Sequence, residues 1–290
     1  MKRREFIKYG ALTAGALTLS PYTRIFADDA KKKYANDIVT LGKTGIKVSR
    51  LAMGTGTHGF SHQSDQSRMS GGGSLPGLLR VAFDHGINFW DSADQYGTHP
   101  DLKEALKSIP REKVVILTKA ESTTADEMKS DLDRFRKEIG TDYIDIVLLH
   151  MMIRSDWPNQ KQGAMEVLEK ARQDGIIRAH GVSCHTLEAL EAAANSSWVQ
   201  IDFARINPAG VIMDADVSTV ESVLKKMHSD GKGVVGMKIF GAGRLVDKRD
   251  ECLRYILNLD FVDAFTIGQR GQDEMLDLLA RIPEASVAAG

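Results

Sequence analysis

Short apolar runs alternate with longer amphipathic stretches along most of the chain. The runs, such as "VVILTK" and "YIDIVLLH", are rich in Val, Ile and Leu, which is typical of buried parallel strands. Strands separated by helices of ordinary length indicate parallel βαβ units. The stretches between the runs have a helical period and predict helices near 75–85, 101–108, 124–138, 161–174, 186–194, 216–230, 250–258 and 272–280.

The pattern predicts eight strands, each followed by a helix: 48–54 and the runs "INFWD", "VVILTK", "YIDIVLLH", "IRAHGVS", "IDFARI", "GVVGMKI" and "AFTIG". Residues 38–290 are close in number to the ~250 residues typical of a (β/α)8 barrel. The alternative, an open doubly wound sheet, carries a G-x-G-x-x-G turn after its first strand. "GTGTHGF" at 54–60 matches that turn only loosely. We therefore predict an α/β fold, a (β/α)8 TIM barrel over 38–290, with an N-terminal β-hairpin that turns at 42–45.

The first residues differ in character from the rest. "MKRREFIKYG" places Arg3 and Arg4 before an uncharged stretch at 9–23, which is shorter than the ~20 residues of a membrane-spanning helix. A basic start followed by a short apolar region is typical of an export signal, and paired arginines indicate the twin-arginine route. The alternative, a basic amphipathic helix packed on the domain, lacks an apolar stripe of helical period. We expect a twin-arginine signal peptide at 1–27 and a linker at 28–37.

This signal predicts where the protein acts. We expect the twin-arginine export machinery to be a partner and the protein to be exported to the periplasm. Ile25, Phe26 and Ala27 form a poor small-x-small cleavage site. An uncleaved signal that anchors the protein in the inner membrane is therefore the alternative.

Composition excludes several classes of function. The formal net charge of -1 over 290 residues provides no basic footprint for nucleic acid. The two cysteines, Cys184 and Cys252, are too few for a disulfide framework, a zinc site or an iron–sulfur site, and we expect no metal. Two inert buried thiols are the simpler interpretation. The oligomeric state stays open.

Candidate chemistry gathers at the predicted ends of three consecutive strands. Asp91 ends the second strand, with Tyr96 in the loop beyond it, Lys119 ends the third and His150 ends the fourth. The C-terminal ends of barrel strands share one rim, and adjacent strands lie about 4.8 Å apart, so these side chains are placed to converge. Each alone has a simpler explanation, as a turn cap, a packing aromatic, a snorkelling lysine or a structural histidine.

Together the four residues suit carbonyl chemistry. Reduction of a carbonyl by hydride leaves an alkoxide that needs a proton, and a phenol can donate it if its pKa falls below the usual ~10. We expect the ammonium of Lys119 to lower the pKa of Tyr96, Asp91 to hold Lys119 charged, and neutral His150 to orient the carbonyl. Tyr96 would then be a general acid in reduction and a general base in oxidation.

The segments that carry these residues resemble a known family. "GINFWDSADQYG" (86–97), "VVILTK" (114–119) and "IDIVLLH" (144–150) are similar, in order, to the catalytic segments of the aldo-keto reductases. The resemblance continues through "LGKTGIKVSRLAMGTG", "GVS", "INP" and "IGQ" and so spans the whole predicted domain. It implies an oxidoreductase that acts on a small-molecule carbonyl or alcohol. It also implies NADP(H), with NAD(H) as the alternative, bound across the C-terminal rim without a Gly-rich turn or a metal.

The resemblance also implies a cofactor site, with departures from the family pattern. Cys184 stands where the family has an asparagine for the nicotinamide carboxamide, and Met237 stands where an aromatic covers the nicotinamide ring. Arg270 is placed for a 2'-phosphate or, equally, is a solvated charge at a helix start. The implied cofactor residues are Ser183, Cys184, Asn207, Met237, Lys238, Gly241, Gly243, Arg244 and Arg270. Met151 and Trp157 either line the substrate pocket or pack within their loop.

Export leaves two further hypotheses open. Free NADPH is not expected outside the cytoplasm, so the nicotinamide would be loaded before export and retained. An enzyme with a trapped cofactor could oxidise and re-reduce one sugar-like substrate, as an isomerase does. A non-catalytic nicotinamide-binding subunit is the other alternative, and the intact set of Asp91, Tyr96, Lys119 and His150 speaks against it.

Overall fold

The structure is a computed structural model that describes residues 32–69 and 73–287. The predicted signal peptide and residues 28–31 of the predicted linker lie outside the described residues. Within the described residues, every helix is too short or too polar to cross a membrane.

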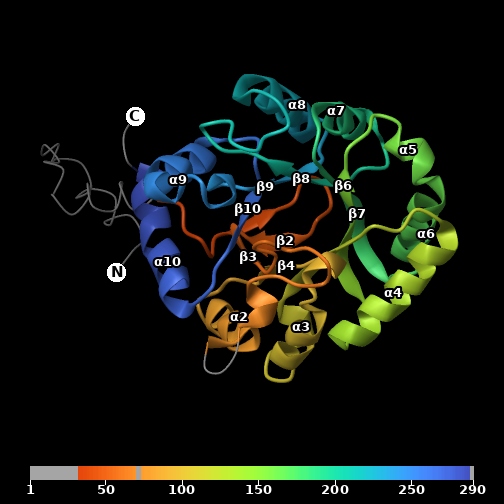
Figure 1. Ribbon diagram of the computed structural model, residues 1–290, viewed down its shortest axis with the longest axis horizontal. Helices are drawn as coiled ribbons and strands as arrows, with labels where there is room; N and C mark the ends of the chain where they lie inside the picture. The colour runs from red at the N-terminus through yellow and green to blue at the C-terminus, as the bar shows by residue number, and fades with distance from the viewer. Residues whose placement is uncertain (1–31, 70–72, 288–290) are drawn as a thin grey trace, which may run out of the picture. The chain divides into compact units, whose positions relative to one another are not determined.

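The strands confirm the predicted barrel. Eight parallel strands close on themselves in the order β10-β3-β4-β5-β6-β7-β8-β9, so each strand pairs with the next along the chain and the last pairs with the first. Figure 1 shows these strands at the centre of the barrel unit. Their bounds are β3 Leu51–Gly54, β4 Phe89–Asp91, β5 Val115–Ala120, β6 Ile144–Met152, β7 Ile177–Cys184, β8 Ile201–Arg205, β9 Gly233–Met237 and β10 Ala264–Gly268.

Helices surround the strands, and each predicted helix is present within two residues of its expected bounds, except that the last one runs seven residues further (Figure 1). The bounds are α2 Leu75–Asp84, α3 His99–Leu106, α4 Ala125–Ile139, α5 Trp157–Gln160, α6 Gln162–Gln173, α7 Leu187–Asn195, α8 Val217–Ser229, α9 Arg249–Asn258 and α10 Gln272–Val287. The short α5 was not predicted. Short 3-10 turns occur at η1 Gln66–Arg68, η3 Asp94–Tyr96, η4 Arg111–Lys113, η5 Gly241–Gly243 and η6 Val246–Lys248.

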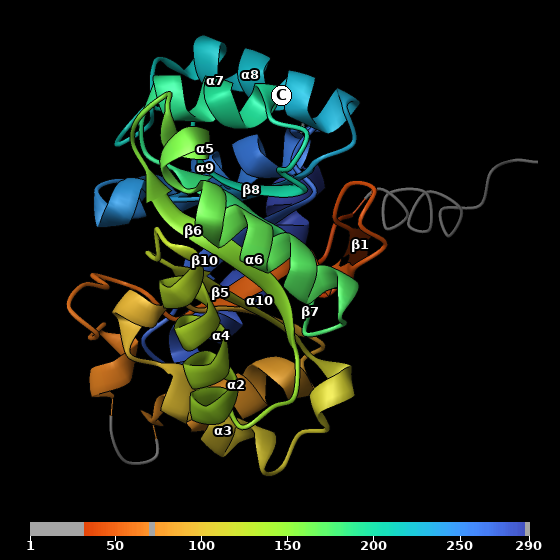
Figure 2. The ribbon, with the colours of Figure 1, turned by 90° about the vertical axis from the view of Figure 1, so that its right-hand side faces the viewer.

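The predicted hairpin closes one end of the barrel. Its antiparallel strands are β1 Ile38–Thr40 and β2 Lys47–Ser49. Leu41, Ile46 and Val48 are at most 1% exposed and pack with the apolar residues inside the barrel. Figure 2 shows the hairpin on the opposite side of the barrel from the loop that follows β3. The N-terminal ends of the strands are therefore covered, and the C-terminal ends are left as the open rim.

Helix α4 shows how local sequence determines an element that supports the site. Thr124 caps its start, because its hydroxyl accepts a hydrogen bond from the Glu127 amide while the Glu127 carboxylate accepts one from the Thr124 amide. Gly140 ends it in the left-handed conformation. Its buried residues recur on one face, at Met128, Leu132, Phe135 and Ile139.

One buried acid in the layer between barrel and helices has no good partner. Asp202 on β8 is fully buried, and neither carboxylate oxygen makes a hydrogen bond of normal geometry with any residue in 32–69 or 73–287. The group that interacts with the Asp202 carboxylate as a donor is the thiol of Cys184, which is a weak hydrogen-bond donor. Burial raises the pKa of Asp202 to about 8, and the nearby carboxylate of Asp214 adds to this. The side chain is therefore protonated at neutral pH.

Asp202→Asn should flatten the pH dependence of stability. Because the folded pKa exceeds the unfolded one, the wild type loses stability as pH rises from about 4 to about 8, by up to several kcal/mol. Asparagine has no proton to lose, so its stability relative to wild type should increase between pH 5 and pH 8 in urea unfolding. Asp126→Asn is the control, because the Asp126 side chain is 96% exposed. It should change neither the stability nor its pH dependence. A difference in stability between Asp202→Asn and the wild type that is constant with pH would contradict the assignment of a protonated Asp202.

Candidate active site

The period of two along each strand builds a polar layer above the apolar barrel interior. Phe89, Leu117 and Leu148 point inward and pack in the interior cluster. Two residues further along the same strands are Asp91, Lys119 and His150, which therefore face the same interior at its open end. The alternation that fills the barrel with apolar side chains thus delivers charged ones to the C-terminal rim.

A buried ion pair lies at the centre of this layer. The ammonium of Lys119, 1% exposed, donates to the carboxylate of Asp91 and, at 2.9 Å, to the carbonyl of Ser92. Thr266 on β10 donates to the other Asp91 oxygen at 2.9 Å. Burial alone would lower the pKa of Lys119, but its interactions with Asp91 and Tyr96 outweigh burial, and the pKa lies above its usual value. Lys119 is therefore a permanent cation.

Tyr96 belongs to the turn η3, which the loop after β4 forms over the rim. The Lys119 ammonium lies over its ring, 5.0 Å from the ring centroid. Desolvation raises the pKa of Tyr96, and the lowering by Lys119 does not overcome it. Our expectation of a net lowering is therefore wrong, although Lys119 acts in the expected direction. Tyr96 is a fully protonated phenol at neutral pH.

His150 completes the group. Its ring meets the Tyr96 ring edge-on, with centroids 5.8 Å apart. Burial lowers its pKa well below the usual range, and the charge of Lys119 adds to this. The imidazole is neutral near pH 7, and within the part of the chain that the structure describes its buried Nδ1 has no hydrogen-bond partner. The structure thus brings together Asp91, Tyr96, Lys119 and His150, which we call the tetrad.

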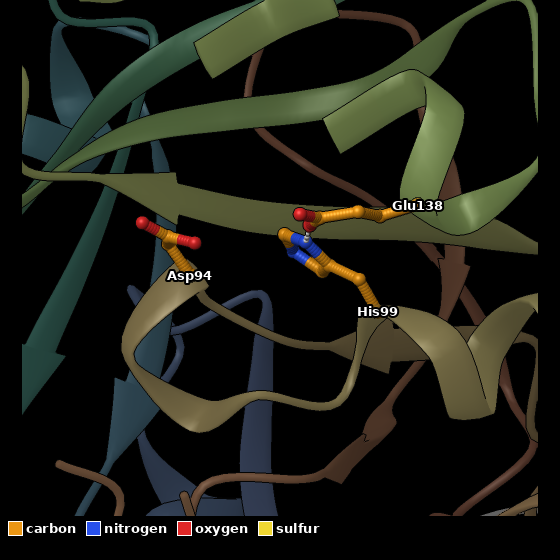
Figure 3. Close-up of side chains that lie close together, drawn as sticks. All are labelled: Asp94, His99 and Glu138. Carbon is orange, nitrogen blue, oxygen red and sulfur yellow. Dashed lines mark hydrogen bonds and ion pairs between the residues drawn. The ribbon is translucent and has the colours of Figure 1, made fainter. Parts of the chain in front are cut away.

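An ion-pair network anchors the turn that carries Tyr96. Arg134 on α4 forks onto both oxygens of Asp94, at 2.7 and 2.9 Å, and also contacts Asp131 and Glu138. His99 at the start of α3 donates to Glu138 at 2.8 Å and accepts from a Thr118 hydroxyl at 2.7 Å. Figure 3 shows His99 facing Glu138, with Asp94 nearby.

Asp94, His99 and Glu138 offer ligand atoms within 4.8 Å of one another, a spacing that a metal ion could bridge. However, Arg134 already supplies the positive charge between the two carboxylates. Both ring nitrogens of His99 are engaged as well. A second cation at this position would be repelled by the guanidinium, so we interpret the cluster as structural.

The structure separates the two residues that follow the pattern of the carboxamide site. Ser183 points into the barrel, and its hydroxyl accepts a hydrogen bond from the Met151 amide at 2.9 Å. Cys184 points outward into the layer between strands and helices, where it is fully buried. Burial raises its thiol pKa well above the usual value. Cys184 therefore does not face the rim.

Asn207, Met237 and Lys238 lie where β8 and β9 end, with different roles. The amide of Asn207 is used within the protein: it donates to the carbonyls of Val211 and Lys238 and accepts from two loop amides. Met237 is 8% exposed at the open end of the interior. Lys238 is half-buried with a left-handed φ of 58°, and burial lowers its pKa.

The remaining predicted cofactor residues lie in loops of the rim. Gly241 and Gly243 have positive φ values, and their amides donate within their own turn, to Lys238 and Phe240. Arg244 is exposed. Arg270 is exposed and pairs with Glu274 at 3.0 Å at the start of α10. The two guanidinium groups, unlike the glycine amides, are accessible.

The two residues expected at the substrate pocket differ in exposure. Met151 is 46% exposed directly after His150 and has a left-handed φ of 59°. Trp157 is 2% exposed, donates from Nε1 to the Ala189 carbonyl, and packs edge-on against Trp198. We therefore assign Met151 to the rim and Trp157 to the packing between α5 and α7.

Sequence reasoning missed three polar residues at the rim. Thr266 bonds Asp91, as described above. His185 follows β7, and burial lowers its pKa to about 4, with Arg205, Lys238 and Lys119 adding to the effect. Gln269 follows β10 and is fully buried, and neither atom of its amide has a hydrogen-bond partner among the described residues. The available signal was a polar side chain within one or two residues of a strand end.

The larger described cavity lies away from this rim. It has a volume of about 500 Å³ and lies beside the hairpin, between the C-terminal ends of α7 and α8. Its lysines, Lys43, Lys226 and Lys232, all donate to backbone carbonyls. Their charges are thus already engaged, and we assign the chemistry to the rim.

Comparison with known proteins agrees with this geometry. The model of the aldo/keto reductase family matches residues 51–259, so the chain belongs to that family. It is an oxidoreductase of a class that interconverts carbonyl and alcohol groups with a nicotinamide cofactor.

The relatives are distant. The chain is 24% identical to D-threo-aldose 1-dehydrogenase of a Pseudomonas species over 71% of its length and 68% of the relative's. It is 24% identical to L-galactose dehydrogenase of Arabidopsis thaliana over 73% of its length and 68% of the relative's. An aldo-keto reductase of Bacillus halodurans in its holo form superposes with a TM-score of 0.68 and 18% identity, over 88% of this chain and 91% of that one, which shows the shared fold.

Arg134→Met should destabilise the protein more than loss of an isolated surface ion pair. It leaves the carboxylates of Asp94, Asp131 and Glu138 facing one another, and we expect a loss of about 1–2 kcal/mol, reduced at high salt. Urea unfolding at low and high ionic strength measures it. Arg154→Met, which removes one exposed pair with Asp156, is the control and should cost much less. Equal losses would contradict a cooperative network.

Proposed function

We propose that this protein is an NADP(H)-dependent oxidoreductase in which Tyr96 exchanges a proton with the oxygen of a carbonyl or alcohol substrate. The observation that supports this proposal most directly is the position of the Lys119 ammonium, 5.0 Å from the centroid of the Tyr96 ring, on a rim where Asp91 keeps Lys119 charged. Hydroxyl, ammonium and imidazole converge there from three consecutive segments of the barrel.

Each tetrad residue has a defined part in reduction. A bound nicotinamide supplies the hydride, and negative charge then grows on the substrate oxygen. Tyr96 donates its proton to that oxygen, and Lys119 stabilises the phenolate that remains. Neutral His150 donates a hydrogen bond to the same oxygen and orients it. Oxidation runs the steps in reverse, with Tyr96 as the base.

The rim has features that suit a dinucleotide. Gln269 is buried with both polar atoms unpartnered, which is costly unless a ligand satisfies them. Lys238, Arg244 and Arg270 bring positive charge to loops at the same end of the barrel and would hold the phosphates. Ser183 remains at the rim, but the outward Cys184 leaves the carboxamide without its usual partner. Recognition of the nicotinamide amide would then rest on other groups.

We favour NADP(H) over NAD(H) because of Arg270. Its guanidinium is exposed at the start of α10, and its present partner, Glu274, is a neighbour on the same helix. Such an exposed pair is weak, so a 2'-phosphate can displace the carboxylate at little cost. The ratio of KM values for NADPH and NADH reports this choice.

Tyr96→Phe should lower kcat for both directions by a factor of about 10² to 10⁴, because the proton donor is lost. Binding of the nicotinamide, measured by fluorescence titration, should change little, since phenylalanine keeps the aromatic ring of Tyr96. Unchanged carbonyl reduction in this variant would exclude the mechanism. A protein that binds nicotinamide and reduces no carbonyl in either form would instead be a binding subunit.

The two directions should differ in pH dependence. The raised pKa of Tyr96 keeps the phenol protonated, so reduction should be nearly constant from about pH 6 to about pH 9, whereas oxidation should rise across that range. Lys119→Met removes a group that lowers the pKa of Tyr96 and should move the oxidation limb to higher pH. A reduction rate that falls steeply above about pH 7 would contradict these signs.

We also propose that the protein is exported by the twin-arginine route and retains its nicotinamide afterwards. The paired Arg3 and Arg4 ahead of a short apolar stretch support this. The route suits proteins that fold around a cofactor before export. A retained cofactor would allow the isomerase-like cycle in which one substrate is oxidised and re-reduced.

Replacement of Arg3 and Arg4 by lysine should hold the protein in the cytoplasm, because the paired guanidinium groups are the recognised feature. Cell fractionation and immunoblotting measure the distribution, and Lys2→Arg is the matched control that should still be exported. The exported wild type should carry nicotinamide through dialysis. Export of the double lysine variant would contradict the route, and empty exported protein that cannot rebind NADP(H) would contradict retention.

A further inference from the structure

The ring of Tyr96 lies in a slot between two glycines of the loop after β3. A Cβ placed on Gly56 would overlap the ring at Cε2 and Cζ and lie 2.5 Å from Cδ2. A Cβ placed on Gly59 would overlap Cδ1 and lie 2.7 Å from Cε1. Real Cβ atoms do not approach other atoms this closely. The Gly56 Cβ would thus lie over the ring face and the Gly59 Cβ against its Cδ1–Cε1 side, so both places are in contact with backbone that only glycine permits.

The backbone conformation does not explain these glycines. Neither has a φ in the left-handed region, whereas the neighbouring His58, Ser61 and His62 do, at 52°, 50° and 57°. Alanine could adopt the conformation of either glycine. The requirement for glycine at 56 therefore comes from the Tyr96 ring, and at 59 it comes mainly from the ring, with the Gly56 carbonyl oxygen 3.0 Å from the Cβ adding to it.

The loop is held against the Tyr96 turn by bonds that prevent it from yielding. The Gly59 amide donates to the Gly56 carbonyl at 3.0 Å, which closes the turn. The His62 imidazole donates to the Asp94 carbonyl at 3.1 Å, and the Ser61 amide donates to the Gln95 side chain at 2.9 Å. A Cβ on Gly97 would overlap the His62 carbonyl, so the two segments interlock at a second place.

We propose that Gly56 and Gly59 are positioning residues that fix where the Tyr96 hydroxyl lies relative to Lys119. They act through Tyr96 and touch no reacting atom. Gly56 is the more direct, because its nearest neighbours include Cζ, the carbon that bears the hydroxyl. A side chain there would displace the ring, and with it the hydroxyl, relative to the ammonium. This inference rests on the proposed role of Tyr96, but the steric contact can be tested without it.

The steric contact is tested by thermal unfolding in a double-mutant cycle. Gly56→Ala should lower the Tm of the wild type by several degrees. In a Tyr96→Ala background the ring is absent, so the same substitution should leave the Tm unchanged or raise it, as glycine-to-alanine changes do where they fit. Gly73→Ala is the control, because a Cβ there meets nothing within 4 Å. An equal loss in both backgrounds would overturn the slot.

The positioning role is tested by kinetics on folded protein. Gly56→Ala should lower kcat for carbonyl reduction by about a hundredfold, the scale of a misplacement of about 1 Å, with KM little changed. The alkaline limb of oxidation should move to higher pH, because the displaced phenol loses the Lys119 interaction. Gly56→Ala added to Tyr96→Phe should cost almost nothing further. A loss of kcat with an unmoved limb would overturn the proposal.

The two tests separate the possible failures. A Tm cycle with the expected coupling and no effect of Gly56→Ala on kcat would refute positioning while the slot stands. If Tyr96→Phe itself keeps full activity, the proposed function fails, and the Tm cycle still reports whether the glycines hold the ring.

Discussion

The buried pair of Lys119 and Asp91 is the interaction on which the rim depends. An isolated ammonium at 1% exposure would be strongly disfavoured, so its carboxylate partner is a condition for its presence. Asp91 is in turn held by Thr266, which lies on the strand beyond β3. Gly54 on β3 lies between them, and a Cβ there would be 2.9 Å from the Thr266 hydroxyl oxygen. The hydrogen bond thus links the last strand of the closed barrel to the second across a glycine.

Two opposing effects set the state of Tyr96. Removal from water favours the neutral phenol, and the adjacent cation favours the phenolate. In this structure desolvation prevails, so the hydroxyl keeps its proton while the ammonium stands ready to stabilise the charge that forms when the proton leaves. Such a group suits proton donation better than proton removal at neutral pH. Neutral His150 does not oppose that cation, because it adds no second positive charge.

The fold was predictable because the local sequence predicts each strand and helix, through apolar runs, helical periods and caps such as Thr124. The tetrad was predictable for the same reason, since Asp91, Lys119 and His150 lie at or near the C-terminal ends of strands whose alternation shows which side chains face inward. The same alternation also separates Ser183 from Cys184, which face opposite sides of one strand. The roles of Asn207 and Trp157 depend on contacts made by their loops and helices after folding, which no strand pattern encodes. The net pKa of Tyr96 depends on surrounding protein that only the assembled rim provides.

The hairpin at the other end has a consequence for traffic. The side chains of Leu41, Ile46 and Val48 close the N-terminal end of the barrel, so its interior is open only at the C-terminal rim. Any molecule that reaches Lys119 enters and departs by the same opening, and two molecules cannot exchange places inside it. The molecule that is bound deeper therefore has to bind first and dissociate last. The order of binding and release thus follows from the closure of the N-terminal end by the hairpin.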